Sequence, residues 1–316
     1  MGKQIFVSIL VPIYNVDKVI GKCLSTLFCQ TYDNLEYVFV NDCTPDRSME
    51  VLKEKLTQYA VPKDKVKIIS HKNNLGIAAT RNDCLNYAKG DYVLFVDSDD
   101  WLELTMVEEL VNSTQNGKID IVACDYFLEK KNGQRIICQE NYGSGCCENM
   151  RKAVNYEIFT ILWKLLIRRS LFSNISFTPD INIGEDYIVS IKLYYYAQTF
   201  YHLHEPLYHY SQINDVRYSN LKIQNIEDHI KAVQEIEFFL KNVHIYDDDI
   251  IRRLNLRKFN IKKYFLDINF LNYERWKTTF PESDRMWREI PYSRKEKVKF
   301  WLAENHLFFL LKLITC

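Results

Sequence analysis

Short apolar runs and helical periodicities alternate along the first part of the chain. Runs typical of buried strands occupy Val7–Ile13, Glu36–Val40, Val66–Ser70, Tyr92–Val96 and Asp120–Cys124. Between these runs, apolar residues recur at helical spacing, most clearly over residues 16–27, 49–56 and 78–88. Such an alternation of strand and helix predicts βαβ units and a mostly parallel sheet. The expected fold class is therefore α/β.

The pattern changes after the fifth of these runs. Residues 132–147 are rich in Gly, Cys and Asn, which predicts a loop or a β-excursion. Three later segments carry helical repeats: residues 185–197, 224–242 and 247–273. Phe300–Ile314 is apolar with few interruptions. A chain of 316 residues suits one main domain with an extension. We expect an α/β domain at residues 1–220 and a helical extension at residues 221–316.

The formal net charge is zero, but the charges are unevenly distributed. Residues 252–299 hold 14 Lys and Arg against 6 Asp and Glu, whereas residues 1–251 hold 26 against 34. A basic helical segment predicts a surface that meets an anionic partner. No nucleic-acid-binding motif accompanies the charge, so we expect no nucleic acid partner. The apolar segment that follows favours peripheral contact with a membrane, and a terminal helix packed on the body stays the alternative.

The nine cysteines show no CxxC pair and no zinc-finger spacing, which predicts reduced thiols in a cytoplasmic compartment. The first residues lack the layout of a cleavable signal. No window offers about twenty uninterrupted apolar residues, as a membrane-spanning helix requires. We expect a cytoplasmic protein, with peripheral contact at the cytoplasmic membrane face as an open alternative.

Polar residues that follow the predicted strands are the candidates for a site, because ligands of such sheets bind beyond the carboxyl ends of the strands. After the first three strands these residues are Pro12, Tyr14, Asn15, Asp42, Asn74, Gly76 and Arg81. Asp42 either caps the next helix or accepts a hydrogen bond from a nucleobase. Arg81 is either solvated or placed to reach diphosphate oxygens near a helix N-terminus.

The fourth strand is followed by Asp97, Ser98, Asp99 and Asp100. Three carboxylates this close repel one another unless a cation lies among them. Hard divalent ions take oxygen ligands, and Mg²⁺ usually combines one or two carboxylates with substrate phosphates. The segment predicts a Mn²⁺ or Mg²⁺ site at Asp97 and Asp99, although Asp-x-Asp also occurs in ordinary turns.

Glu185 and Asp186 open a later predicted helix. Acids in a first turn complement the helix dipole, but beside a metal and nucleotide site they also suit proton abstraction from a hydroxyl group. His202, His204 and His209 lie in an aromatic-rich segment and are interpreted as structural residues. A metal or phosphate contact is the alternative for His209.

Together these segments resemble family 2 glycosyltransferases, an inverting group with the GT-A fold. The resemblance covers about residues 5 to 215. It rests on the opening strand with Pro12 to Asn15, on Asn74-x-Gly76, on Arg81-Asn82, on Asp97-Ser98-Asp99-Asp100 and on Glu185-Asp186. Asn41, Cys43 and Pro45 depart from the family's second motif but leave Asp42 in place. The resemblance implies a Rossmann-like mixed sheet flanked by helices, with a C-terminal helical extension.

The resemblance also implies roles for the residues. Asp42 would hold the nucleobase, and the pocket would be lined by donor-binding residues: Pro12, Tyr14, Asn15, Asn74, Gly76, Arg81 and Ser98. Asp97 would lie near the ribose or the metal, and Asp99 would bind a divalent cation, Mn²⁺ or Mg²⁺. Asp186 would be the catalytic base with Glu185 in support. The donor would be a nucleotide sugar, commonly UDP-linked, and the acceptor a glycan or a lipid-linked saccharide of cell-surface polysaccharide assembly.

Other function classes fit the sequence less well. The first strand end lacks the Gly-rich loop of nucleotidyltransferases, the G-x-G-x-x-G of dinucleotide enzymes and the GK[ST] of P-loop proteins. A catalytically inactive, nucleotide-sugar-binding subunit stays an alternative. It predicts the loss of Asp99 or Asp186, and both residues are present.

Overall fold

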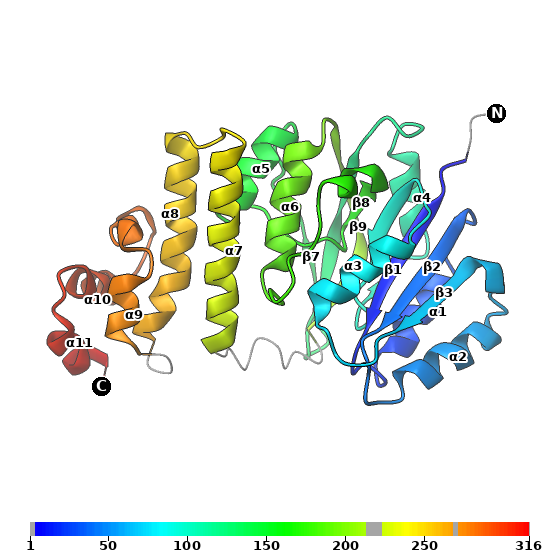
Figure 1. Cartoon of the computed structure of the whole chain (residues 1–316), viewed down its shortest axis with the longest axis horizontal. Coiled ribbons are helices and arrows are strands. Elements are labelled where there is room, and N and C mark those ends of the chain that lie inside the picture. The colour runs from blue at the N-terminus through cyan, green and yellow to red at the C-terminus, as the bar shows by residue number, and fades with distance from the viewer. Residues whose placement is uncertain (1–3, 213–222, 268–270, 316) are drawn as a thin grey trace. The chain divides into compact units, whose positions relative to one another are not determined.

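The computed structural model describes residues 4–212, 223–267 and 271–315. The chain divides into two compact units (Figure 1). The first consists of residues 1–153 with 157–220, and the second of residues 154–156 with 221–316.

One mixed sheet forms the centre of the first unit. Its strands follow the order β3-β2-β1-β4-β8-β6-β9-β5, with β7 paired to β6. The strands are β1 (Val7–Ile13), β2 (Leu35–Asn41), β3 (Val66–Ser70), β4 (Tyr92–Phe95), β5 (Trp101–Leu102), β6 (Ile121–Glu129), β7 (Arg135–Cys138), β8 (Leu165–Arg168) and β9 (Phe200–Ser211). The helices of this unit are α1 (Ile20–Phe28), α2 (Ser48–Gln58), α3 (Ile77–Tyr87), α4 (Met106–Asn112), α5 (Cys146–Val154) and α6 (Glu185–Tyr196).

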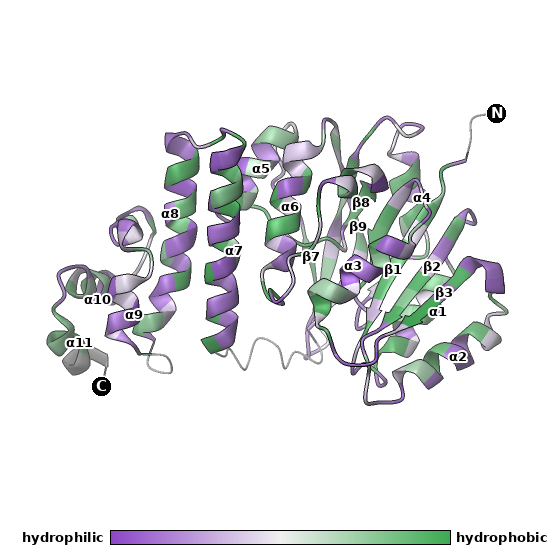
Figure 2. Cartoon of the chain, in the orientation of Figure 1, coloured by the Kyte–Doolittle hydropathy of each residue, from purple (hydrophilic) through white to green (hydrophobic). Residues whose placement is uncertain are grey.

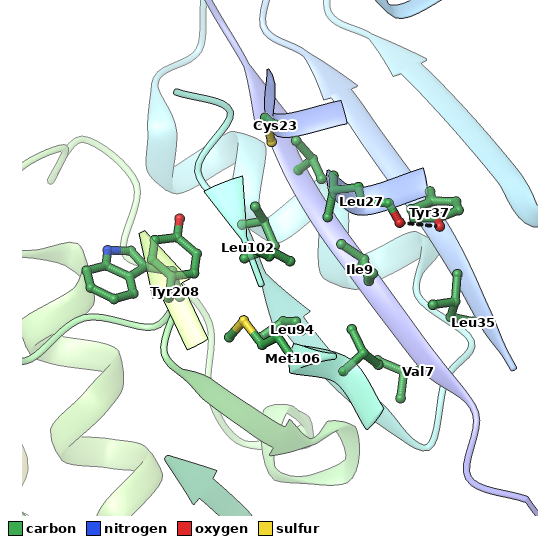
Figure 3. Close-up of a cluster of buried hydrophobic side chains, with 14 of the residues drawn as sticks. Val7, Ile9, Cys23, Leu27, Leu35, Tyr37, Leu94, Leu102, Met106 and Tyr208 are labelled. Carbon is green, nitrogen blue, oxygen red and sulfur yellow. Dashed lines mark hydrogen bonds between the residues drawn. The ribbon is translucent and has the colours of Figure 1, made fainter. Parts of the chain in front are cut away.

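The parallel half of the sheet confirms the βαβ pattern. β1 pairs in parallel with β2 and β4, and β2 pairs in parallel with β3. All seven residues of β1 are buried, which fits a central strand covered on both faces. Figure 3 shows part of the core beside this strand, where Leu27 of α1 lies next to Ile9.

β1 extends further than its neighbour β4. The pairing with β4 ends at Leu10, whereas the pairing with β2 continues to Ile13. Pro12 therefore lies beyond the last residue pair with β4. Its missing N–H costs no ladder hydrogen bond on that side, which explains how a central strand accommodates proline.

From β4 onward the sheet departs from the mostly parallel pairing that the βαβ pattern predicts. β8 pairs antiparallel with β4 and β6, β9 pairs in parallel with β6, and β5 pairs antiparallel with β9. The pattern did not predict these three strands, because β5 and β8 are short and β9 is mostly aromatic and His. The expected β-excursion within residues 132–147 is confirmed, since β7 forms an antiparallel pair with β6.

The second unit is helical. Its helices are α7 (Ile223–Asn242), α8 (Asp248–Lys262), α9 (Tyr273–Thr278), α10 (Arg294–Glu304) and α11 (Phe308–Thr315). Figure 2 shows polar and apolar residues alternating along α7 and α8. The prediction of one helix over 247–273 is wrong, because α8 ends at Lys262 and Asn272 caps a new helix by accepting from Arg275 N. Residues 268–270 lie outside the described residues.

Several basic side chains of the second unit are neutralised inside it. Lys258 is buried and contacts Glu237 and Glu282, each at 2.7 Å. Lys262 is buried against Asp284. The excess of basic residues in this segment is thus only partly a solvent-facing charge. Across the described part of the chain, no helix combines the length and apolar character needed to span a bilayer.

Candidate active site

The aspartates after β4 form one cluster. Carboxylate oxygens of Asp97, Asp99 and Asp100 lie within 4.8 Å of one another. Asp100 is buried and accepts hydrogen bonds from Tyr208 Oη at 2.9 Å and Ser211 N at 2.7 Å. Burial and the two neighbouring carboxylates raise the pKa of Asp100 well above its ordinary value. Asp97 and Asp99 are half-buried, so they form the solvent-facing side of the cluster.

Tyr208 of β9 fixes the turn that carries this cluster. Its ring stacks on Trp163 with centroids 4.1 Å apart, and its hydroxyl also accepts a hydrogen bond from Asp97 N at 3.2 Å. Because the hydroxyl donates to Asp100, one tyrosine holds both the backbone and a side chain of the turn. Sequence reasoning missed Tyr208 and the role of Asp100, since both depend on the pairing of β9.

Arg81 connects the aspartate cluster to the acid pair of α6. Its Nη2 donates to Asp97 Oδ1 at 3.1 Å, and its Nη1 donates to Glu185 Oε1 at 2.8 Å and to Asp186 Oδ1 at 2.5 Å. The guanidinium is buried, so little solvent screens these contacts. The aspartate cluster and the acid pair, which are far apart in sequence, therefore contact the same cation. The diphosphate contact expected of Arg81 stays a prediction.

The acid pair has unusual proton affinity. Burial raises the pKa of Asp186 well above its ordinary value, and the charge of Arg81 offsets only part of this effect. Burial also raises the pKa of Glu185. A carboxylate with a raised pKa is a stronger base once ionised, and general bases work best with a pKa near the working pH. This arrangement is chemically suited to accept a proton.

Asp42 organises the loop between β3 and α3. Its Oδ1 accepts from Leu75 N at 2.7 Å and its Oδ2 accepts from Gly76 N at 2.9 Å. Asp42 is buried, so these hydrogen bonds compensate for the lost hydration of its charge. Asp42 is not the cap of α2, whose N-cap residue is Arg47. Its carboxylate instead accepts hydrogen bonds from the loop that carries Asn74 and Gly76.

Gly76 requires a backbone that other residues avoid. Its φ is +86°, and a Cβ at this position would lie 2.2 Å from Asn182 Oδ1. Asn182 precedes α6, so the loop at Gly76 passes close to the segment that presents Glu185 and Asp186. Asn74 is exposed in the same loop. The loop of Gly76 therefore lies beside the segment that leads into α6. The donor-binding roles of Asn74 and Gly76 stay predictions.

His71 is a further site residue that sequence reasoning missed. Its Nδ1 lies 2.8 Å from Asp42 Oδ1, and its Nε2 lies 2.8 Å from Asp83 Oδ2. Its side chain is only 6% exposed. His71 directly follows β3, so the rule that selected the other strand-end residues would have found it.

We expect His71 to titrate above the ordinary histidine range. Burial lowers its pKa, but the hydrogen bonds to Asp42 and Asp83 outweigh this effect and raise it. The stability that a raised histidine pKa contributes is complete below the unfolded value of about 6.5 and is lost as the pH rises through the folded pKa. NMR titration of the imidazole nitrogens should show a lower His71 pKa in Asp83→Asn, with His244 as internal reference. An equal pKa in both proteins would contradict the assignment.

The turns after β1 and β2 are tied together. Asn15 N donates to Thr44 Oγ1 at 2.8 Å, and Thr44 Oγ1 donates to Asp46 Oδ1 at 2.6 Å. Asp46 Oδ2 also accepts from Asp17 N at 2.8 Å. Hydrogen bonds from Ser48, Thr44 and these backbone groups outweigh burial and lower the pKa of Asp46 to about 2. Asp46 thus holds a loop that leaves the Tyr14 ring 47% exposed beside Asn15.

His209 is enclosed by protein groups. Its Nδ1 lies 2.8 Å from Glu129 Oε1 and its Nε2 lies 2.9 Å from Glu103 Oε1. Its ring stacks between Trp101 and Phe127, with centroids 5.1 Å and 4.7 Å away. With both ring nitrogens occupied by carboxylates, His209 fits the structural interpretation better than a metal or phosphate contact.

The chain is similar to a known protein family. The family model described as glycosyl transferase family 2 matches residues 8–184. This range includes the motifs at the strand ends and stops just before Glu185 and Asp186. The chain belongs to glycosyl transferase family 2. EpsJ of Bacillus subtilis (strain 168), an uncharacterized glycosyltransferase, is 30% identical over 214 residues, 65% of this chain and 61% of EpsJ. The poly(ribitol-phosphate) beta-glucosyltransferase of Bacillus spizizenii is 26% identical over 270 residues, 82% of this chain and 40% of that protein. The chain therefore spans less than two thirds of the length of these curated relatives.

Two solved structures have the same fold as this chain. TarS of S. aureus (residues 1–349), crystallised with UDP-GlcNAc, superposes with a TM-score of 0.71 at 19% identity, covering 98% of this chain and 90% of that one. The mannosyltransferase PcManGT of Pyrobaculum calidifontis, crystallised with GDP-Man and Mn²⁺, gives a TM-score of 0.54 at 16% identity, covering 99% and 83%. At these identities the likeness concerns the fold, and it confirms the GT-A fold with a helical C-terminal region.

Proposed function

We propose that this family 2 protein is an inverting, metal-dependent glycosyltransferase. It moves a sugar from a nucleotide-diphosphate donor, for which we propose a UDP-sugar, to a hydroxyl group of the acceptor. The acceptor is a glycan or a lipid-linked saccharide in cell-surface polysaccharide assembly. One observation carries the proposal: Arg81 holds Asp97 of the metal-type cluster and the Glu185–Asp186 pair at the same guanidinium. A leaving-group site and a proton acceptor therefore lie next to each other.

The donor nucleotide is assigned to the ends of β1, β2 and β3. Among the described residues, Leu75 N and His71 use Oδ1 of Asp42 and Gly76 N alone uses Oδ2, which leaves one acceptor position on Oδ2. That position suits an N–H group of the nucleobase. Around it, the base and ribose would meet the donor-binding residues Pro12, Tyr14, Asn15, Asn74, Gly76, Asp97 and Ser98.

The diphosphate is assigned to the aspartate cluster. Asp97 and Asp99 offer carboxylate oxygens, which Mn²⁺ and Mg²⁺ prefer as ligands, and Asp100 is held back by Tyr208. The cation would neutralise negative charge on the departing diphosphate. Asp97 also bonds to Arg81, so the position of this ligand is fixed before the donor binds.

The acceptor is assigned to the side of Asp186. As the hydroxyl attacks the anomeric carbon, Asp186 would take its proton, and Glu185 would keep Arg81 in place. A single displacement from the face opposite the diphosphate inverts the configuration of that carbon. The name of one relative, a poly(ribitol-phosphate) beta-glucosyltransferase, supports a polymer hydroxyl as the acceptor group.

A donor screen tests the proposal. Purified protein with Mn²⁺ is heated with each of a panel of UDP-, GDP- and dTDP-sugars. At a free concentration about one hundred times its Kd, the true donor should add roughly 2.7 kcal/mol to the free energy of unfolding. Stabilisation by a UDP-sugar followed by transfer supports the proposal, and stabilisation without donor hydrolysis or transfer supports the inactive-subunit alternative. If no nucleotide sugar stabilises the protein, the proposal is wrong.

A cytoplasmic location and peripheral contact with its membrane face stay predictions. The membrane contact is supported by Trp301 and Val298 of α10, each 47% exposed, and by the exposed Lys295 and Lys297 near them. Flotation of the protein with vesicles of anionic lipid would test this contact. Recovery of all the protein in the soluble fraction at low salt would exclude it.

A further inference from the structure

A second group of metal-type side chains lies on β6 and β9 and shares no residue with the aspartate cluster. It consists of Asp125, His202 and His204. His202 pairs with Ala123 in the parallel register, and side chains two residues apart in a strand point to the same face. Asp125 lies two residues beyond Ala123 and so shares the face of His202, whereas His204 lies between Leu203 and Pro206, where β9 is irregular. The register shifts next to Asp125, and such irregularities often re-aim side chains.

The three side chains converge. Their ligand atoms lie within 4.8 Å of one another, His202 Nε2 lies 2.8 Å from Asp125 Oδ1, and the two imidazole centroids are 4.0 Å apart. The ring of His202 also packs edge-on against Tyr142, with centroids 4.8 Å apart. Glu140 N donates to Asp125 Oδ1 at 3.3 Å. Two of the three groups are therefore held in place by the surrounding protein.

Asp125 carries an unmatched acceptor. The residue is completely buried, yet its Oδ2 has no hydrogen-bond partner among the residues that the structure describes. The buried ammonium of Lys164 donates to Glu140 Oε1 at 2.6 Å, so its hydrogen bond goes to another carboxylate. A buried carboxylate without full compensation is costly. Its position beside two imidazoles points to a cation as the missing partner.

We propose that Asp125, His202 and His204 bind a Zn²⁺ ion. Two imidazoles and one carboxylate suit zinc better than Mg²⁺ or Ca²⁺, which prefer oxygen ligands alone. His204 is exposed, so the ion is reached from solvent and a water completes a tetrahedral set. The ion would clip β9 to β6 where their register shifts. This site goes beyond the proposed transfer reaction, which uses none of these residues.

Zinc and cobalt titrations test the site in the full-length chain. The Asp99→Asn variant is used throughout, so that the aspartate cluster does not compete. Calorimetry should show one Zn²⁺ per chain, and Co²⁺ should produce the visible d–d bands of a low-coordinate nitrogen and oxygen site. Adding His204→Ala should weaken Zn²⁺ binding by about 100-fold or more, since loss of an outer-shell partner alone costs 10–100-fold. His204→Cys, which replaces one zinc ligand by another, should retain binding.

The matched control replaces a histidine that lies outside the proposed zinc site. His244→Ala removes an exposed histidine of the other unit and should leave Zn²⁺ affinity and the Co²⁺ spectrum unchanged. Because His204 is exposed, its replacement should not prevent folding, and the unfolding temperature without metal checks this. Absence of Zn²⁺ binding in Asp99→Asn, or equal affinity in Asp99→Asn and its His204→Ala derivative, would overturn the proposal.

Discussion

Replacing Asp186 by Asn should lower the rate of sugar transfer by about 10²- to 10⁴-fold, the usual contribution of a positioned general base. Asn keeps the shape of Asp and can still accept the hydrogen bond from Arg81, but it cannot take the proton of the acceptor hydroxyl. The donor Kd from calorimetry should stay unchanged while kcat falls, which places the loss in the chemical step. In the unmodified enzyme, kcat should decline with falling pH at a pH above the ordinary carboxyl range, because burial raises the pKa of Asp186.

Glu185→Gln is the matched comparison for this variant. It alters the neighbouring carboxylate that contacts the same Arg81 nitrogen. If the loss in Asp186→Asn came only from disturbing Arg81, both variants would lose activity equally. A much smaller loss in Glu185→Gln supports Asp186 as the base. NMR of the product should show an anomeric configuration opposite to that of the donor, and retained configuration would rule out the proposed displacement.

Replacing Asp99 by Asn should lower Mn²⁺-dependent transfer by at least about 10²-fold. A cation at a departing diphosphate supplies several kcal/mol of transition-state stabilisation, and each 1.36 kcal/mol is a factor of ten. The variant should fold normally, because Tyr208 holds the turn through Asp97 N and Asp100, and both contacts remain in the variant. Calorimetry with UDP, with and without Mn²⁺, should show that the variant loses the effect of metal on nucleotide binding.

Asp64→Asn is the control for this substitution. Asp64 is an exposed carboxylate in the short 3-10 turn before β3, so its loss tests the effect of one negative charge away from the cluster. Its rate and its metal dependence should equal those of the unmodified enzyme. Full transfer activity in the presence of EDTA would show that no cation takes part, whatever the outcome of the Asp99 variant.

Much of the parallel half of the sheet could be predicted from local sequence. β1 and β3 have the predicted bounds, and β2 extends its predicted run by one residue at each end. Buried parallel strands are continuous apolar runs with helices between them, so a short stretch of sequence is enough to identify each one. β8 and β9 could not be predicted in this way, because they are defined by partners far away in the chain.

The same difference separates the residues of the site. The sequence by itself determined that acids, amides and a glycine lie at the carboxyl ends of the strands. The alternation of strands and helices predicts parallel strands, and the carboxyl ends of parallel strands lie at the same edge of the sheet. Only the tertiary structure decided their partners. Arg81 meets Asp186 across 105 positions of sequence, Asp42 is held by His71, and Asp125 meets His202 where β6 and β9 shift register. These contacts depend on burial, which strengthens each charge interaction and is created only when distant strands pair.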